Sequence, residues 1–209
     1  MEEIKNIKTA LISVFSKDGL DDLVLKLHSS NVKILSTGGT QKYIEGLNIP
    51  VTPVEQLTDY PSILGGRVKT LHPKVFGAIL ADINNKKHLN QIKKFDILSI
   101  ELIVVNLYPF EQTVKNNKSL NDCIENIDIG GPSLIRAAAK NYFSKAVIVD
   151  KNDYKIIISE IKKNKGISLE TRKKLAVKAF KRTMEYDLEI FKWFNESTEN
   201  TKDNHFFLM

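Results

Sequence analysis

Short apolar runs rich in β-branched residues alternate with segments of helical periodicity along much of the chain. The run Thr9–Phe15 (T-A-L-I-S-V-F) is nearly free of polar interruption, as expected of a strand buried on both faces. Leu20, Leu23 and Leu27 then recur at helical spacing. Four further extended segments are predicted, at Val32–Ser36, Asn48–Val54, Ser99–Leu107 and Ala146–Asp150. This β-α-β order constrains the chain to an α/β fold with a mainly parallel sheet and right-handed crossovers.

The C-terminal part of the chain has a different pattern. Residues 168–195 are helical in period, and one apolar face is predicted to dock on the sheet domain as a helical cap. That face comprises Phe180, Met184, Leu188 and Phe191. We therefore predict an α/β domain over residues 1–150, a helical extension of the same domain over 151–195, and a polar, mobile tail over 196–209.

Composition excludes several classes of function. The net charge of +6 is spread along the chain, and its densest run, Lys162–Lys165, lies in a polar stretch typical of a solvated face. Cys123 is the only cysteine, which excludes a disulfide framework, and no spacing of His, Asp or Glu is typical of a metal site. No apolar run is long enough to span a membrane, and residues 1–5 lack a signal-peptide pattern. We predict a cytoplasmic protein without nucleic-acid or membrane partners.

Polar side chains follow several of the predicted strands. In an open parallel sheet, ligands bind outside the C-terminal ends of the strands, so these residues are expected at one edge. Ser16 and Lys17 follow the first strand, and Asn106 and Tyr108 end a later one. The segment Ser36–Thr40 (S-T-G-G-T) combines exposed glycine amides, hydroxyls and a helix start, which favours a phosphate site over a purely topological turn. It is neither a Walker A loop nor a G-x-G-x-x-G motif.

Two more glycine-containing stretches carry candidate ligand-binding groups. Residues 64–73 (L-G-G-R-V-K-T-L-H-P) place Arg67, Lys69, Thr70 and His72 within six positions, and Pro73 is expected to end any helix begun there. The residues alone leave ligand binding and a plain surface loop equally open.

The stretch 128–133 (D-I-G-G-P-S) is a glycine turn at a helix start. Such a turn can hold a carboxylate or stabilise an oxyanion, or it can be no more than a helix start. Lys140, late in the same helix, has the position of a lysine that extends to solvent, and Tyr108 that of a core aromatic.

Taken in chain order, five segments resemble one known family. They are S-V-F-S-K-D-G-L, L-S-T-G-G-T, L-G-G-R-V-K-T-L-H-P, V-N-L-Y-P-F and D-I-G-G-P-S-L-I-R-A-A-A-K-N. Over residues 8–195 the chain resembles the IMP cyclohydrolase domain of bifunctional purine biosynthesis proteins. The resemblance implies a methylglyoxal-synthase-like, doubly wound α/β sheet. It also implies closure of the purine ring of 5-formamidoimidazole-4-carboxamide ribotide, giving IMP and water without metal or organic cofactor.

The same resemblance implies the roles of particular residues. Lys69, Tyr108, Asp128 and Lys140 match catalytic positions: Asp128 and Lys140 handle protons, and Lys69 polarises Tyr108 or the formyl oxygen. The implied substrate-binding residues are Ser13, Ser16, Lys17, Ser36, Thr37, Gly38, Gly39, Thr40, Arg67, Thr70, Asn106, Ile129, Gly130 and Gly131. The sequence itself does not place Lys140 beside Asp128, because Lys140 lies eight positions after Pro132, which is ~12 Å along a helix.

The chain departs from the family in length. Family members continue into a larger domain that formylates aminoimidazole carboxamide ribotide from 10-formyltetrahydrofolate, whereas this chain stops at Met209. A stand-alone enzyme and a fragment are both open, as are a homodimer and a separate transformylase partner. Two competing functions share the expected fold, namely methylglyoxal synthase and the non-catalytic nucleotide-binding module of carbamoyl phosphate synthetases. Methylglyoxal synthase does not call for the R-V-K-T-L-H-P and V-N-L-Y-P-F motifs together. The module would keep the phosphate loop but has no reason to retain the set Lys69, Tyr108, Asp128 and Lys140.

Overall fold

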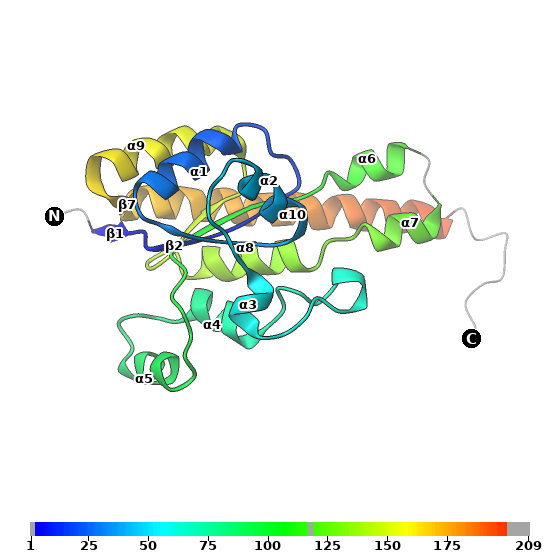
Figure 1. Ribbon diagram of the computed structural model, residues 1–209. Coiled ribbons are helices and arrows are strands. Elements are labelled where there is room, and N and C mark those ends of the chain that lie inside the picture. The colour runs from blue at the N-terminus through cyan, green and yellow to red at the C-terminus, as the bar shows by residue number, and fades with distance from the viewer. Residues whose placement is uncertain (1–2, 117–118, 200–209) are drawn as a thin grey trace.

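A five-stranded parallel sheet forms the centre of the protein (Figure 1). The computed structural model describes residues 3–116 and 119–199. The strands lie in the order β4-β3-β2-β5-β6, and every neighbouring pair is parallel. Their bounds are β2 Thr9–Val14, β3 Lys33–Ser36, β4 Thr52–Pro53, β5 Leu102–Asn106 and β6 Ala146–Ile148. The predicted α/β fold with a parallel sheet is confirmed.

Helices cover both faces of this sheet. The helices of the described chain are α1 Leu20–Ser29, α2 Gly38–Gly46, α3 Val54–Thr58, α4 Pro73–Leu80, α5 Lys86–Lys94, α6 Phe110–Lys115, α7 Leu120–Glu125, α8 Gly130–Lys140, α9 Tyr154–Asn164 and α10 Leu169–Glu199, with short 3-10 turns η1 Leu64–Gly66 and η2 Lys151–Asp153. In Figure 1, α1 and α9 lie above the sheet and α4 and α8 below it. The protein is therefore doubly wound, as expected.

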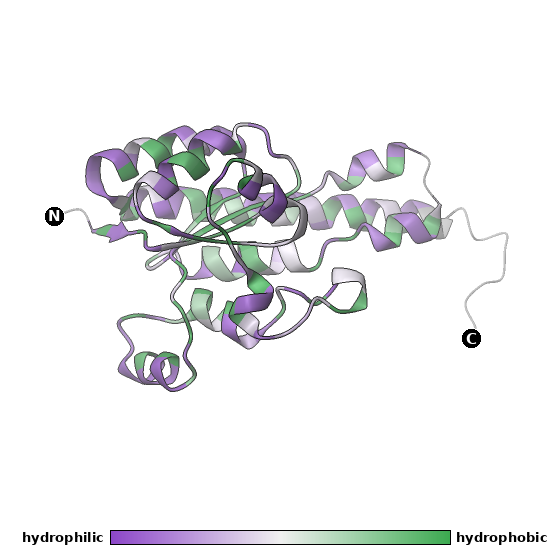
Figure 2. Ribbon diagram, viewed as in Figure 1, coloured by the Kyte–Doolittle hydropathy of each residue, from purple (hydrophilic) through white to green (hydrophobic). Residues whose placement is uncertain are grey.

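Side chains that alternate along the strands pack into two separate hydrophobic cores. On β2, Ala10 and Ile12 pack with α1 and α9, whereas Leu11 between them packs with α4, α8 and α10. This period of two follows from the strand pleat, and it explains why the strands are apolar at nearly every position. Figure 2 shows α1 and α9 in mixed green and purple, as expected of helices with one buried face.

A second, two-stranded sheet ties the chain's N-terminal end to the start of α10. Strand β1 (Ile4–Asn6) pairs antiparallel with β7 (Gly166–Ser168). The approach requires glycine, because a β-carbon at Gly166 would stand 2.4 Å from the carbonyl oxygen of Lys5. Next to it, the fully buried Arg172 of α10 donates hydrogen bonds to the carbonyl oxygens of Tyr142 and Phe143, each at 3.0 Å. These bonds fasten α10 to the segment that follows α8.

Helix α10 docks by a face other than the predicted one. Ala176, Ala179 and Tyr186 are buried in the core that contains α8, and Leu175 is buried in the core on the other side of the sheet. The predicted face is instead exposed, with Phe180 at 41%, Met184 at 60%, Leu188 at 45% and Phe191 at 64%. The helix carries two apolar stripes, and the one built from smaller residues and tyrosine lets α10 approach α8 closely.

Two other predictions about element ends were wrong. Pro73 begins α4 instead of ending a helix, because proline suits the first helical position. His72 caps that helix by accepting a hydrogen bond from the backbone N–H of Lys74 at 3.1 Å. The predicted tail is helical as far as Glu199, and the rest of it, residues 200–209, lies outside the described residues. Within the described ranges, no helix is long and apolar enough to cross a membrane.

Candidate functional site

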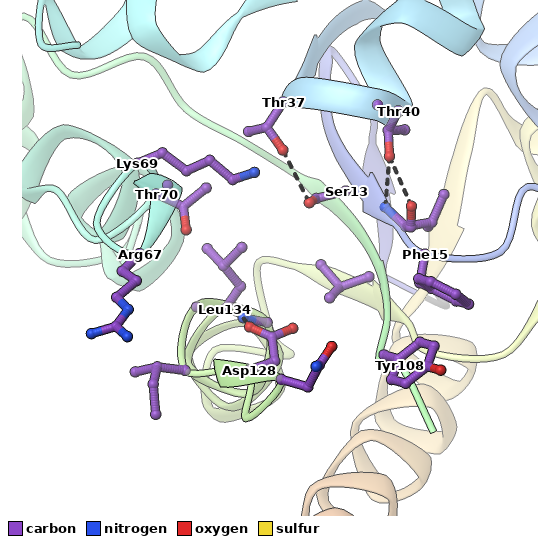
Figure 3. Close-up of a pocket in the computed structure, with 18 of the residues that line it drawn as sticks. Ser13, Phe15, Thr37, Thr40, Arg67, Lys69, Thr70, Tyr108, Asp128 and Leu134 are labelled. Atoms are coloured by element: carbon purple, nitrogen blue, oxygen red, sulfur yellow. Dashed lines mark hydrogen bonds between the residues drawn. The ribbon is translucent and has the colours of Figure 1, made fainter. Parts of the chain in front are cut away.

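A cavity of about 750 Å³ opens at the C-terminal edge of the parallel sheet (Figure 3). It lies where the strand ends β2, β3 and β5 meet η1 and the N-terminus of α8, as the parallel-sheet rule predicts. Most of the predicted site residues line it: Ser13, Lys17, Thr37, Gly39, Thr40, Arg67, Lys69, Thr70, Asn106, Tyr108, Asp128, Ile129, Gly130 and Gly131. Segments more than a hundred residues apart thus share one cavity.

The loop between β3 and α2 forms one wall. Thr37 is the N-cap of α2, and the amides of Gly38 and Gly39 donate to no group in the described part of the chain. The Thr40 hydroxyl accepts from the Val14 N–H at 3.1 Å and donates to the Val14 carbonyl at 2.9 Å. The Ser13 and Thr37 hydroxyls lie 3.2 Å apart. The loop is fixed to β2, and its free amides lie at the positive end of a helix, an arrangement suited to an anion.

Two residues of this loop support it from outside the cavity lining. Ser36 is fully buried and donates to the Ile12 carbonyl at 2.7 Å, so its hydroxyl joins two strands. Gly38 has φ +48°, a left-handed conformation that favours glycine. A β-carbon at Gly38 would stand 3.6 Å from Nζ of Lys69, which places the Lys69 ammonium against this loop.

The strand ends β2 and β5 are joined through Asn106. Its side-chain oxygen accepts from the backbone N–H groups of Phe15 and Ser16, and its amide donates to the Ser16 carbonyl at 3.0 Å. Asn106 therefore fixes the turn after β2, and Ser16 faces a neighbouring cavity instead of the main one. The Lys17 ammonium donates to the carbonyls of Val14 and Phe15 at 2.9 and 2.8 Å, and its burial lowers its pKa.

Residues 67–70 form the opposite wall. Arg67 is exposed and makes an ion pair with Glu125, which raises the pKa of the Arg67 guanidinium. Thr70 is buried, and its hydroxyl lies 3.0 Å from where a β-carbon of Gly130 would stand. Loop 64–73 and the start of α8 are in close contact, which accounts for glycine at position 130.

Asp128 lies immediately before α8 and is held by two hydrogen bonds. Its carboxylate accepts from the Gly131 N–H at 2.8 Å, and its own backbone N–H donates to the Tyr186 hydroxyl at 2.8 Å. A β-carbon at Gly131 would stand 2.3 Å from the Asp128 carboxylate and 2.7 Å from Leu107, so only glycine fits there. The sequence interpretation missed Tyr186, because its helical face was not the one expected to dock.

Tyr108 and Lys69 lie on opposite sides of the cavity in Figure 3, with Asp128 between them. The Tyr108 ring packs edge-on against Phe15, with ring centroids 4.4 Å apart and an interplanar angle of 79°. This separation does not favour direct polarisation of Tyr108 by Lys69. Both groups line the cavity, on different walls.

Lys140 is not brought to the cavity. It is exposed at the last position of α8, whereas Asp128 precedes the first, so the helix length anticipated from the sequence separates them. His72 also lies outside the lining, as a helix cap. Among the described residues, no group of three or more His, Cys, Asp or Glu side chains is arranged to hold a metal ion.

Fold and site together define a doubly wound α/β domain with a polar ligand cavity at the C-terminal edge of its sheet. Residues 19–133 match the MGS-like domain family, and residues 138–208 match the AICARFT/IMPCHase bienzyme family. The chain belongs to the MGS-like domain family.

Relatives named bifunctional purine biosynthesis protein PurH are similar over nearly the whole chain. The protein from Corynebacterium glutamicum (strain R) is 51% identical over 195 residues, which are 93% of this chain and 37% of that protein. The protein from Bacteroides thetaiotaomicron is 50% identical over 196 residues, covering 93% and 39%. This chain therefore spans well under half the length of these relatives. The predicted resemblance to bifunctional purine biosynthesis proteins is confirmed.

A solved structure titled "Crystal structure of ForH" has the same fold. It superposes with a TM-score of 0.81 at 28% sequence identity, covering 90% of this chain and 96% of that one.

Proposed function

We propose that this chain is an IMP cyclohydrolase, which closes the purine ring of 5-formamidoimidazole-4-carboxamide ribotide with loss of water in the last step of IMP synthesis. One observation carries the proposal: a single cavity combines a helix N-terminus with free amides and the side chains of Lys69, Tyr108 and Asp128. The names of the PurH relatives support a role in purine biosynthesis.

The 5′-phosphate is assigned to the β3–α2 loop. A phosphate dianion bound there accepts hydrogen bonds from the amides of Gly38 and Gly39 and lies at the positive end of α2. Thr37 and Ser13 offer hydroxyl donors beside it. The Lys69 ammonium next to Gly38 supplies counter-charge. The cavity then extends from this loop toward Asp128, where the base of the nucleotide is placed.

The chemistry requires two poorly reactive groups to be held face to face. The carboxamide nitrogen attacks the formyl carbon, and the formyl oxygen leaves as water with one hydrogen from the carboxamide nitrogen and one from the formamido nitrogen. We assign removal of the carboxamide proton to the Asp128 carboxylate, which the Gly131 amide holds at the start of α8. The Tyr108 hydroxyl donates a hydrogen bond to the formyl oxygen as negative charge develops on that oxygen.

Lys140 enters the proposal through the resemblance alone. It does not line the cavity of its own chain. Contacts between Asp128 and Tyr186 and between Arg136 and Phe180 indicate that α8 and α10 run antiparallel, with Lys140 one turn beyond Arg136. Lys140 therefore lies near the beginning of the exposed apolar stripe of α10, defined as Val177, Phe180, Met184, Leu188 and Phe191.

The catalytic role of Lys140 fits an assembly of two copies. If two α10 stripes pair antiparallel about Met184, position 177 of one copy lies opposite position 191 of the other. Lys140 then lies on the C-terminal side of Met184 in the second copy's α10, the side on which Tyr186 holds that copy's Asp128. The proposal accordingly includes a homodimer in which Lys140 acts in the cavity of the second copy.

Two substitutions test the assignment within the cavity. Asp128→Asn keeps the size of the side chain but removes the base, and we expect kcat to fall at least about a hundredfold while IMP still binds. Lys69→Ala should lower kcat and should also weaken IMP binding, because it removes the positive charge beside the phosphate loop. Lys74→Ala is the matched control, since Lys74 lies five residues further on and does not line the cavity. Asp128→Asn with a wild-type kcat would remove Asp128 from the mechanism.

A further inference from the structure

Tyr186 holds the loop that carries Asp128. It is on α10, 1% exposed, and its hydroxyl accepts the Asp128 backbone N–H at 2.8 Å. Asp128 comes between the end of α7 and the start of α8, so no helix or strand satisfies this amide. A buried donor without a partner is costly, which makes the tyrosine hydroxyl the group that fixes this turn.

The two hydrogen bonds of Asp128 hold different parts of the residue. Tyr186 fixes the backbone from the α10 side, and the Gly131 amide fixes the carboxylate at 2.8 Å from the α8 side. Together they determine where the carboxylate oxygens stand relative to the cavity. Burial raises the pKa of the Tyr186 phenol, so Tyr186 is a neutral hydrogen-bonding group at neutral pH.

We propose that Tyr186 is a positioning residue for Asp128, through which helix α10 sets the geometry of proton transfer. This inference rests on the proposed function, because it assigns Asp128 a proton to remove. In this proposal α10 does not only cover the sheet. It also supplies the Tyr186 hydroxyl, on which the position of Asp128 depends. A shift of the carboxylate by about 1 Å costs on the order of a hundredfold in rate.

The test compares Tyr186→Phe with Tyr154→Phe. Both tyrosines are buried and lose only a hydroxyl, but the Tyr154 hydroxyl makes no hydrogen bond within the described residues and α9 covers the other face of the sheet. We expect Tyr186→Phe to lower kcat about ten- to a hundredfold with KM within about twofold, because the phosphate loop is untouched. Tyr154→Phe leaves both constants unchanged.

Amide hydrogen exchange provides a readout that needs no activity. In Tyr186→Phe the Asp128 amide should exchange about tenfold faster, and Tyr154→Phe should leave it unchanged. Faster exchange with an unchanged kcat would overturn the positioning role, and unchanged exchange would overturn the hydrogen bond itself. If the wild-type chain forms no IMP, the proposed function fails, and the exchange result still decides whether Tyr186 holds the turn.

Discussion

The ammonium of Lys69 lies against the backbone of Gly38, with its Nζ 3.6 Å from the point where a β-carbon of Gly38 would stand. This relationship joins two loops that looked independent in the sequence. Loop 64–73 could have been plain surface, and the Gly-Gly turn could have served topology alone. Their contact gives the free amides of α2 a neighbouring positive charge, which is what a phosphate site needs.

Replacing Gly38 with alanine tests this junction. We expect Gly38→Ala to cost about 1–2 kcal/mol of stability, because φ is +48°, and to weaken IMP binding about tenfold as the loop shifts. Gly46→Ala, at the other end of α2, is the control: nothing lies within 4 Å of its β-carbon position, and stability should rise slightly. Titration calorimetry and thermal unfolding measure both effects. Equal IMP affinity in the two variants would argue against the loop as the phosphate site.

Mixing two inactive variants tests whether Lys140 acts in a second copy. Lys69→Ala and Lys140→Ala should each lose orders of magnitude in kcat when assayed alone. After unfolding and refolding together in equal amounts, about a quarter of wild-type activity should return, because half of the dimers are mixed and each has one intact site. Full activity of Lys140→Ala alone would exclude a catalytic role for Lys140. A mixture that stays inactive would place both lysines in the same copy's cavity.

Much of the fold was predictable, because strands buried on both faces leave strong patterns. The period-two alternation of Ala10, Leu11 and Ile12 between two cores requires apolar residues at each position. The site's location followed from the parallel sheet, since residues after its strands must meet at one edge.

The choice of the docking face of α10 was not predictable. The two apolar stripes of α10 differ in the size of their side chains. The stripe with the larger side chains was expected to dock, but it is the exposed one. Close approach to α8 favours Ala176 and Ala179, a packing constraint that periodicity does not contain. The Tyr186–Asp128 hydrogen bond depends on that choice, so it was missed with it.

The exposed stripe itself is tested by Met184→Lys. The side chain is 60% exposed, so the fold should lose no more than about 0.5 kcal/mol, whereas Ala179→Lys, at a fully buried position, should cost at least about 3 kcal/mol. Met184→Lys should also be monomeric by analytical ultracentrifugation, because it sets like charges opposite each other at the centre of the proposed pairing. A Met184→Lys protein that still dimerises would contradict pairing through this stripe.

Lys145 gives the fold a distinct pH dependence. Lys145 is 1% exposed, and its Nζ donates a hydrogen bond to the Ser99 hydroxyl at 3.3 Å. Burial lowers the pKa of the Lys145 ammonium from 10.5 to about 8. The unfolded chain therefore binds more protons between these two values, so the unfolding free energy rises with pH from about 8 to about 10. Lys145→Met should remove this rise, as measured by urea unfolding across that range. The same slope in both proteins would mean that Lys145 titrates normally.

The central claim is tested most directly by adding the purified chain to 5-formamidoimidazole-4-carboxamide ribotide and following IMP by absorbance and chromatography. We predict saturable IMP formation far above the uncatalysed rate, without added metal or cofactor, and its loss in Asp128→Asn. If the wild-type chain binds IMP but forms none above the uncatalysed rate, the chain is a nucleotide-binding module and the proposed enzyme activity is contradicted.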